Sequence, residues 1–140
     1  MKEIGDESVH AFFSLLSKQL SKDLIAMDKN NAPTIIIKSG KTIRQIEIKD
    51  LLYIECDCYV STFSMADGSK IDCTYSLAYF EEKLSPWRFE RISRNVIVSL
   101  RDVVAIKSKI GNRKTVIMKD GREFDIAFRK WKRFKVAFYK

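Results

Sequence analysis

Residues 89–100 read FERISRNVIVSL, two short runs of strand-forming residues on either side of the polar residues Ser93, Arg94 and Asn95. Short runs rich in Ile, Val and Phe, bounded by polar turn residues, are typical of β-strands. The expected strands cover residues 88–93 and 96–100. The same pattern continues in both directions from this stretch, and it predicts a β domain.

Eight further runs of this kind are expected to form strands, at residues 34–38, 41–48, 51–55, 59–65, 70–74, 103–107, 115–119 and 122–126. Two Asp-Gly pairs, Asp67-Gly68 and Asp120-Gly121, separate neighbouring runs. Glycine tolerates the positive φ that tight primed turns require, so each pair predicts a hairpin. Residues 59–65 should pair with 70–74, and residues 115–119 with 122–126.

Two short helices interrupt or end the β pattern. Ser76 can cap a helix over residues 76–84 whose inward side chains are Leu77, Phe80 and Leu84, and Pro86 follows it. Residues 128–139 place Trp131, Phe134 and Phe138 at helical spacing among Lys and Arg side chains. We expect a short basic helix there, with its aromatic rings docked in the core.

The N-terminal part has a different pattern. Residues 7–28 carry apolar side chains at steps of three and four, which predicts one amphipathic helix with Asp6 as its N-cap. Residues 29–33 have the polar and proline content of a linker. The apolar stripe either packs on the following domain or dimerises with a second copy. We therefore divide the chain into an extension with its linker, 1–32, and a mostly β domain, 33–140.

The charge is concentrated at one end. The formal net charge is +8, yet residues 1–100 hold 13 Lys and Arg against 14 Asp and Glu, whereas residues 101–140 hold 13 against 4. An acidic polymer or surface is the expected partner of such a field.

Several classes of protein do not fit the composition. No apolar run is long enough to cross a bilayer and no signal peptide is visible, so we expect a cytoplasmic protein. The three cysteines have no paired metal-site spacing, and His10, the only histidine, lies in the expected N-terminal helix. We expect reduced thiols, no metal, no cofactor and no catalysis, because convergent acid, base or nucleophile groups are missing.

Residues 89–100 also resemble a signature of the LytTR family of bacterial DNA-binding domains. Other landmarks lie in the family's order along the chain. Before this stretch come IKDLLYIE at 48–55, Tyr59-Val60, Asp67-Gly68 and Ser76-Leu77, and after it come Asp120-Gly121 and a basic segment opening at Arg129. The resemblance spans about residues 33–140. It implies an elongated antiparallel β fold that inserts loops into successive major grooves of duplex DNA, commonly as two copies on a direct repeat, with bending.

The resemblance also assigns three reading loops: Cys56-Asp57-Cys58, Ser93-Arg94-Asn95 and the entry to the last helix at Arg129-Lys130. A guanidinium matches guanine O6 and N7, and an Asn amide matches adenine N6 and N7. Arg94 and Arg129 are the leading base-reading candidates, followed by Asn95, Asp57 and Ser93. Arg94 could instead be a solvated turn charge, and Arg129 could contact phosphate only.

Contacts to DNA phosphates are expected from cationic side chains near the C-terminus, namely Lys107, Lys109, Arg113, Lys114, Lys130 and Arg133. The chain departs from the family pattern at three places. Ser93 stands where His is common, Ser99 where Asn is common, and Ala127-Phe128 where a Ser is frequent. These differences leave the preferred DNA sequence open.

The leading hypothesis is a transcription regulator that binds double-stranded DNA, a homodimer if residues 7–28 pair. The family's usual receiver domain is not expected within 32 residues, so phosphorylation could act only through a separate protein. Two alternatives remain open. A β module could bind RNA or single strands, or residues 128–140 could bind anionic membranes or acidic proteins.

If residues 7–28 dimerise the chain, deleting residues 1–30 should halve the mass measured by light scattering in solution. An unchanged mass would show instead that the apolar stripe does not join two copies.

Overall fold

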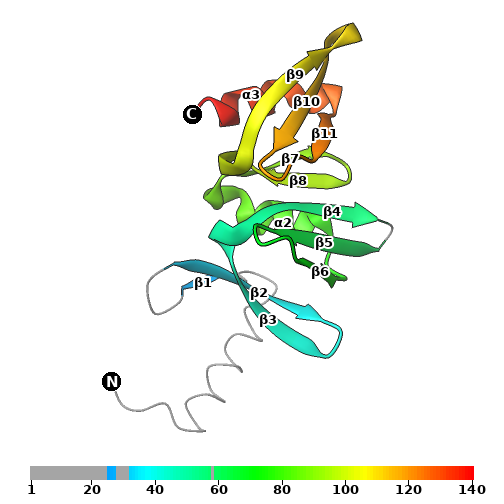
Figure 1. Ribbon diagram of the computed structural model, residues 1–140. Helices are drawn as coiled ribbons and strands as arrows, with labels where there is room; N and C mark the ends of the chain where they lie inside the picture. Colours follow the sequence, from blue (N-terminus) through cyan, green and yellow to red (C-terminus); the bar gives the residue numbers. More distant parts are fainter. Residues whose placement is uncertain (1–24, 28–31, 58) are drawn as a thin grey trace, which may run out of the picture.

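The protein is described here by a computed structural model that covers residues 25–27, 32–57 and 59–140. Within these residues the chain forms three antiparallel sheets and two short α-helices, arranged one after another along a single long axis (Figure 1). This arrangement confirms the predicted elongated, mostly β fold.

The first sheet has the strand order β1-β2-β3, from Ile25–Met27, Pro33–Ser39 and Thr42–Glu47. The sequence periodicity was wrong for residues 25–27, which it placed in a helix. These residues pair with β2, Ile25 lying opposite Ile35, because pairing with a neighbouring strand outweighs a local helical pattern. The rest of the expected helix and its Asp6 cap lie outside the described residues.

The central sheet has five strands in the order β6-β5-β4-β8-β7. Their bounds are β4 Leu51–Asp57, β5 Val60–Met65, β6 Lys70–Cys73, β7 Phe89–Ser93 and β8 Val96–Ser99. The middle strand, β4, pairs with its sequence neighbour β5 on one side and with the distant β8 on the other, Tyr53 lying opposite Val98. This non-local pairing places the β4–β5 and β7–β8 turns at the same end of the sheet.

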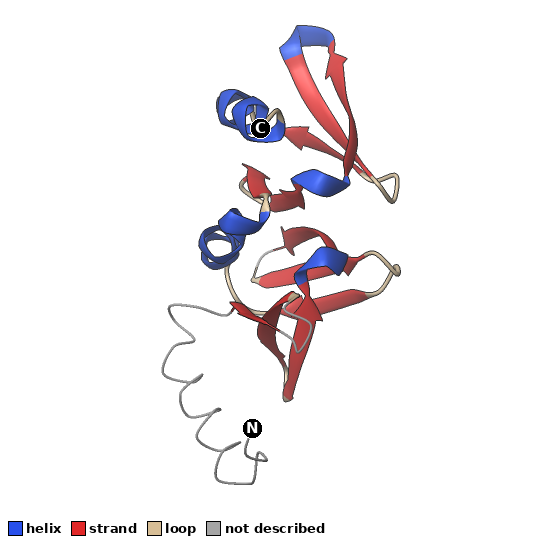
Figure 2. Ribbon diagram, turned by 90° about the vertical axis from the view of Figure 1, so that its left-hand side faces the viewer, coloured by secondary structure: helices blue, strands red, loops and turns tan. Residues whose placement is uncertain are grey.

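The third sheet follows at the other end of the molecule, with the strand order β11-β10-β9. Its strands are β9 Val103–Lys109, β10 Arg113–Met118 and β11 Glu123–Ile126. The β9–β10 hairpin extends beyond the other elements at the top of Figures 1 and 2.

Both helices agree with the sequence prediction. Helix α2, Leu77–Leu84, is capped by Ser76, whose hydroxyl accepts the Tyr79 N–H at 3.2 Å, and it continues into a 3-10 turn at Ser85–Trp87. Helix α3, Trp131–Phe138, follows a 3-10 turn at Phe128–Lys130. Neither described helix is long and apolar enough to span a membrane.

Two apolar cores lie on opposite faces of the central sheet. On one face, in the first core, Phe63 of β5 packs edge to face on Phe80 of α2, with ring centroids 4.9 Å apart. On the other face, in the second core, β8 packs with the third sheet and with α3. The rings of α3 dock in this core as predicted, and Phe134 stacks between Trp131 and Phe138. A sheet buried on both faces needs apolar side chains in both directions, and β4 therefore begins with four buried residues in a row.

The two Asp-Gly pairs form the predicted hairpins, but the predicted turn type was wrong. The Gly68 N–H donates to Met65 O at 3.0 Å, and the Gly121 N–H donates to Met118 O at 2.8 Å. Gly68 and Gly121 have φ of 91° and 92°, whereas the aspartates before them do not have positive φ. A primed type I turn requires positive φ at both central residues, so these are ordinary turns followed by a left-handed glycine.

A cluster of hydrogen-bonded polar side chains joins the β10–β11 turn to β4. The Arg122 guanidinium makes two hydrogen bonds to the Glu55 carboxylate, at 2.8 and 3.2 Å, and lies over the rings of Tyr53 and Phe124. The Tyr53 hydroxyl donates to Asp120 at 2.7 Å. Burial raises the pKa of Tyr53, and the bond to Asp120 adds to this effect. The third sheet is thus held to the central one by directed bonds as well as by the core.

Phe80→Ala should lower the free energy of unfolding by about 3 to 5 kcal/mol, because it leaves a cavity between α2 and the central sheet. Urea denaturation followed by circular dichroism measures this loss. The control is Phe128→Ala, which removes a ring that is 84% exposed. It should change stability by less than about 0.5 kcal/mol, as surface substitutions usually do. Equal losses in the two variants would contradict this description of the first core.

Candidate nucleic-acid interface

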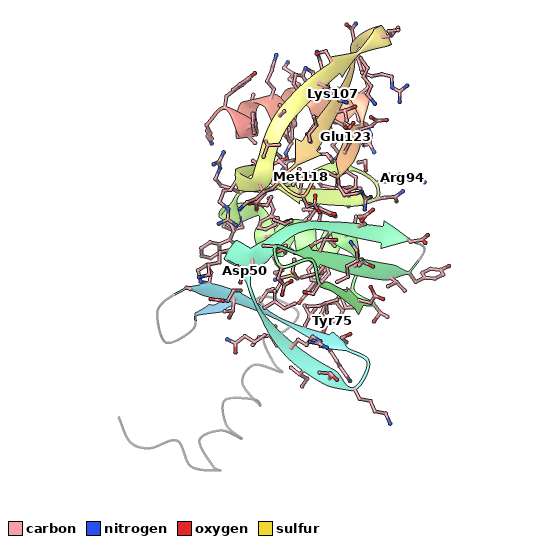
Figure 3. All side chains as sticks on the ribbon, viewed as in Figure 1. Asp50, Tyr75, Arg94, Lys107, Met118 and Glu123 are labelled. Carbon is pink, nitrogen blue, oxygen red and sulfur yellow. The ribbon has the colours of Figure 1, made fainter. Side chains whose placement is uncertain are left out.

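The β7–β8 turn holds Ser93, Arg94 and Asn95, the second of the expected reading loops. The Ser93 hydroxyl accepts the Asn95 N–H at 3.2 Å. The Arg91 guanidinium stabilises the turn by donating to Ser93 O at 3.2 Å and to Arg94 O at 2.7 Å. Arg91 is itself held by Glu81 of α2 at 3.2 Å. The backbone is therefore fixed while the Arg94 side chain extends into solvent at the right of Figure 3.

The first expected loop lies directly beside this turn. The Cys56 N–H donates to Asn95 O at 2.8 Å, which joins the end of β4 to the β7–β8 turn. Asp57 is exposed at the end of β4, and Tyr59, the turn residue just before β5, is 88% exposed. Cys58 lies outside the described residues. A hollow of about 400 Å³ between the two loops is lined in part by Tyr59, Arg94 and Asn95.

The third expected loop is tied to the second one. The Ala127 N–H donates to Ile92 O at 2.7 Å, and the Lys130 N–H closes the 3-10 turn by donating to Ala127 O at 2.8 Å. Arg129 is exposed on this turn. One backbone hydrogen bond thus joins the first two loops, and a second joins the third loop to Ile92 of β7, the residue before Ser93. The three loops lie toward the right-hand side of Figure 1.

The cationic candidates fall into two groups. In the part of the chain that the structure describes, no ion pair involves the side chains of Arg94, Arg129 or Lys130. The candidates on the third sheet and α3 do have partners, as follows. Lys107 pairs with Glu123 at 3.1 Å, Lys109 and Arg113 with Asp125 at 3.9 and 2.8 Å, and Arg133 with Glu90 at 3.3 Å, while Lys114 donates to Ser108 at 2.8 Å.

The pKa values of two of the partner carboxyl groups, Asp125 and Glu90, are shifted. The Thr115 hydroxyl and then the Arg113 guanidinium lower the pKa of Asp125, so this carboxylate stays charged beside the hairpin cations. Burial raises the pKa of Glu90 despite the nearby Arg133. Among the described residues, no three His, Cys, Asp or Glu side chains gather as metal ligands.

Two residues of this region were missed in the sequence. Tyr59 and Phe128 present exposed rings next to the first and third loops. Tyr59 and Phe128 opened an expected strand and helix, where an aromatic residue suggests core packing. Their exposure depends on how the turns direct the two side chains, which a linear pattern does not reveal.

Comparisons with known proteins agree with this fold. The family model of the LytTr DNA-binding domain matches residues 41–138. A solved structure described as the LytTr DNA-binding domain of a methyl-accepting/DNA response regulator from Bacillus cereus superposes with a TM-score of 0.65. It is 18% identical in sequence, and the match covers 74% of this chain and 94% of that one. A search of curated proteins finds no match. The chain belongs to the LytTR family of DNA-binding domains.

Proposed function

We propose that the protein is a transcription regulator that binds duplex DNA sequence-specifically, with its three loops in the major groove. The observation that carries the proposal is the row of three turns joined by backbone hydrogen bonds, which presents Arg94 and Arg129 without ion pairs within the described chain. Guanidinium groups held on fixed backbone can distinguish base pairs, because their donors match the acceptors of guanine.

The dimensions support this reading mode. The first two loops are joined by the bond from Cys56 N–H to Asn95 O, so both can enter one major groove, which is about 12 Å wide. Arg94 would read guanine, and the Asn95 amide could read adenine. Asp57 and Ser93 would complete the contacts by accepting from cytosine or from a neighbouring donor.

Contacts to the DNA backbone would come first from Lys130, since it lies next to Arg129 and has no ion pair in the described chain. Lys107, Lys109 and Arg113 must give up their carboxylate partners to bind phosphate. We therefore propose that these three contribute less to affinity than their charge suggests. Lys114 and Arg133 would likewise have to leave Ser108 and Glu90.

The assembly on DNA is also a proposal. Two copies would bind a direct repeat in the cytoplasm, joined through residues 7–28 if that segment dimerises. Each copy would comprise an extension, residues 1–32, and the DNA-binding domain, residues 33–140. We propose no catalytic step.

The exposed rings of Tyr59 and Phe128 favour one alternative, binding of RNA or single strands, where bases stack on aromatic side chains. A third possibility, binding to anionic membranes or acidic proteins through an inserted residue 128–140 helix, fits less well. The rings of Trp131, Phe134 and Phe138 pack against the second core and are not available for insertion into a membrane.

Selection of bound duplexes from a random library tests the function directly. An enriched direct repeat would support it, and a salt titration on the selected duplex would show how much of the affinity is electrostatic. Tighter binding to single strands than to any duplex would overturn it in favour of the first alternative.

Arg94→Ala should weaken binding to the selected duplex by about 1 to 3 kcal/mol, because one base contact with two hydrogen bonds is lost. Binding to random duplex should change little. Fluorescence anisotropy with both duplexes measures the difference, and equal losses on the two would mean that Arg94 does not read bases.

Lys130→Ala should weaken binding to selected and random duplex alike, since a phosphate contact carries no sequence information. Lys107→Ala also removes one positive charge, but Glu123 already neutralises that charge in the folded protein. Its effect on the affinities for selected and random duplex should therefore be smaller. A larger loss for Lys107→Ala than for Lys130→Ala would contradict the division of the cations by their ion pairs.

A further inference from the structure

A groove of about 860 Å³ lies between α3 and the segment that runs from the Ser85–Trp87 turn into β7. It is the largest of the hollows described for this chain, and no reading loop except the Arg129 turn borders it. Five cationic side chains line it: Arg88, Arg129, Lys132, Arg133 and Lys140.

The positive charge of the groove is poorly neutralised. Glu90 is the one acidic residue in its lining, and its carboxylate is bound to Arg133 at 3.3 Å. Arg88 donates to the backbone oxygen of Phe138 at 3.4 Å, and neither Lys132 nor Lys140 takes part in an ion pair of the described chain. The groove therefore attracts anions strongly.

The groove also has an apolar part. Phe89 and Leu100 are buried beneath it, whereas Val136 of α3 is 61% exposed and faces it. An apolar side chain left in water beside several cations favours a ligand that combines negative charge with an apolar group. DNA supplies the charge, but its phosphate backbone is polar, and the thymine methyl groups that could cover Val136 lie within the major groove.

The groove leads away from the three loops. Arg129 and Lys140 are separated by the whole of α3, whose 8 residues alone correspond to about 12 Å at ~1.5 Å per residue. Figure 2 views the molecule from the left of Figure 1, and there the C-terminal end of α3 faces the viewer. The C-terminal end of α3 lies at the left of Figure 1, whereas Arg94 lies at the right of Figure 3. The end of the groove that Lys140 lines is thus on the side away from Arg94, where a second protein could reach it while DNA occupies the loops.

We propose that this groove binds an acidic segment of a partner protein, with Asp or Glu carboxylates at the cations and an aliphatic or aromatic side chain on Val136. Arginine forks suit carboxylates, and an apolar contact at the centre of a polar rim is the usual anatomy of a protein interface. The proposal does not depend on base reading by Arg94.

The test begins with selection from a random peptide library displayed on phage, using the full chain as bait. The selected peptides should be rich in Asp and Glu and contain Leu, Ile or Phe. A synthetic, labelled copy of the leading peptide is then titrated with two variants of matched chemistry. Val136→Glu alters the groove, and Val104→Glu alters β9, where Val104 is 62% exposed and outside the groove.

Val136→Glu should weaken peptide binding about tenfold, the scale of one contact at an interface centre, whereas Val104→Glu should leave it unchanged. Both variants add one negative charge, so a general field effect would weaken both equally and overturn the proposal. Selection of no peptides, or of peptides without acidic residues, would overturn it as well.

Duplex DNA separates this proposal from the proposed function. Arg129 and Arg133 belong to the groove and also to the proposed DNA contacts, so a selected duplex should weaken peptide binding without abolishing it, and Val136→Glu should bind that duplex as Val104→Glu does. Complete displacement of the peptide would place the groove on the DNA path and refute a protein partner there. If the unaltered chain and both variants bind no duplex, the proposed function is refuted. The peptide titration still decides the groove proposal, because it does not depend on DNA binding.

Discussion

Burial of the central sheet on both faces is the constraint on which the rest of the structure depends. Strand β4 lies in the middle of that sheet, with Ile54 directed into one core and Tyr53 into the other. A strand between two cores cannot shift its register by one residue without exchanging its two sets of side chains. The register of β4 therefore also fixes where β5 and β8 begin, and with them the turns that carry Asp57 and Arg94.

The placement of the loops follows from this register through short connections. The bond from Cys56 N–H to Asn95 O continues the β4–β8 pairing into the loop region, and the bond from Ala127 N–H to Ile92 O extends it to the turn before α3. Arg91 adds a brace between α2 and the second turn. Side chains that could contact bases thus lie on backbone that is already organised, which reduces the ordering cost of binding.

The sequence predicts those features that depend on near neighbours in the chain. Ser76 caps α2 as expected, and both Asp-Gly hairpins pair as expected, because each involves a few consecutive residues. Features set by distant partners were not predicted. The pairing of β1 with β2 overrides a helical pattern, and the ion pair between Lys107 and Glu123 requires two strands separated by a third. The assignment of three loops to DNA reading came from the resemblance and stays a prediction, whereas the hydrogen bonds between these segments could be seen only in three dimensions.

The shared carboxylate of Asp125 has a consequence for how ions behave when DNA binds. The counterion of Lys109 and Arg113 is a carboxylate of the protein itself. A solvated lysine, by contrast, has no such carboxylate to leave when it binds a phosphate. If both side chains move to DNA, the carboxylate left behind takes up a cation from the buffer, and this uptake offsets part of the release from the DNA atmosphere. The logarithm of the affinity would then fall less steeply with the logarithm of salt concentration than the number of phosphate contacts implies. For a protein built this way, counting contacts from that slope gives a lower limit.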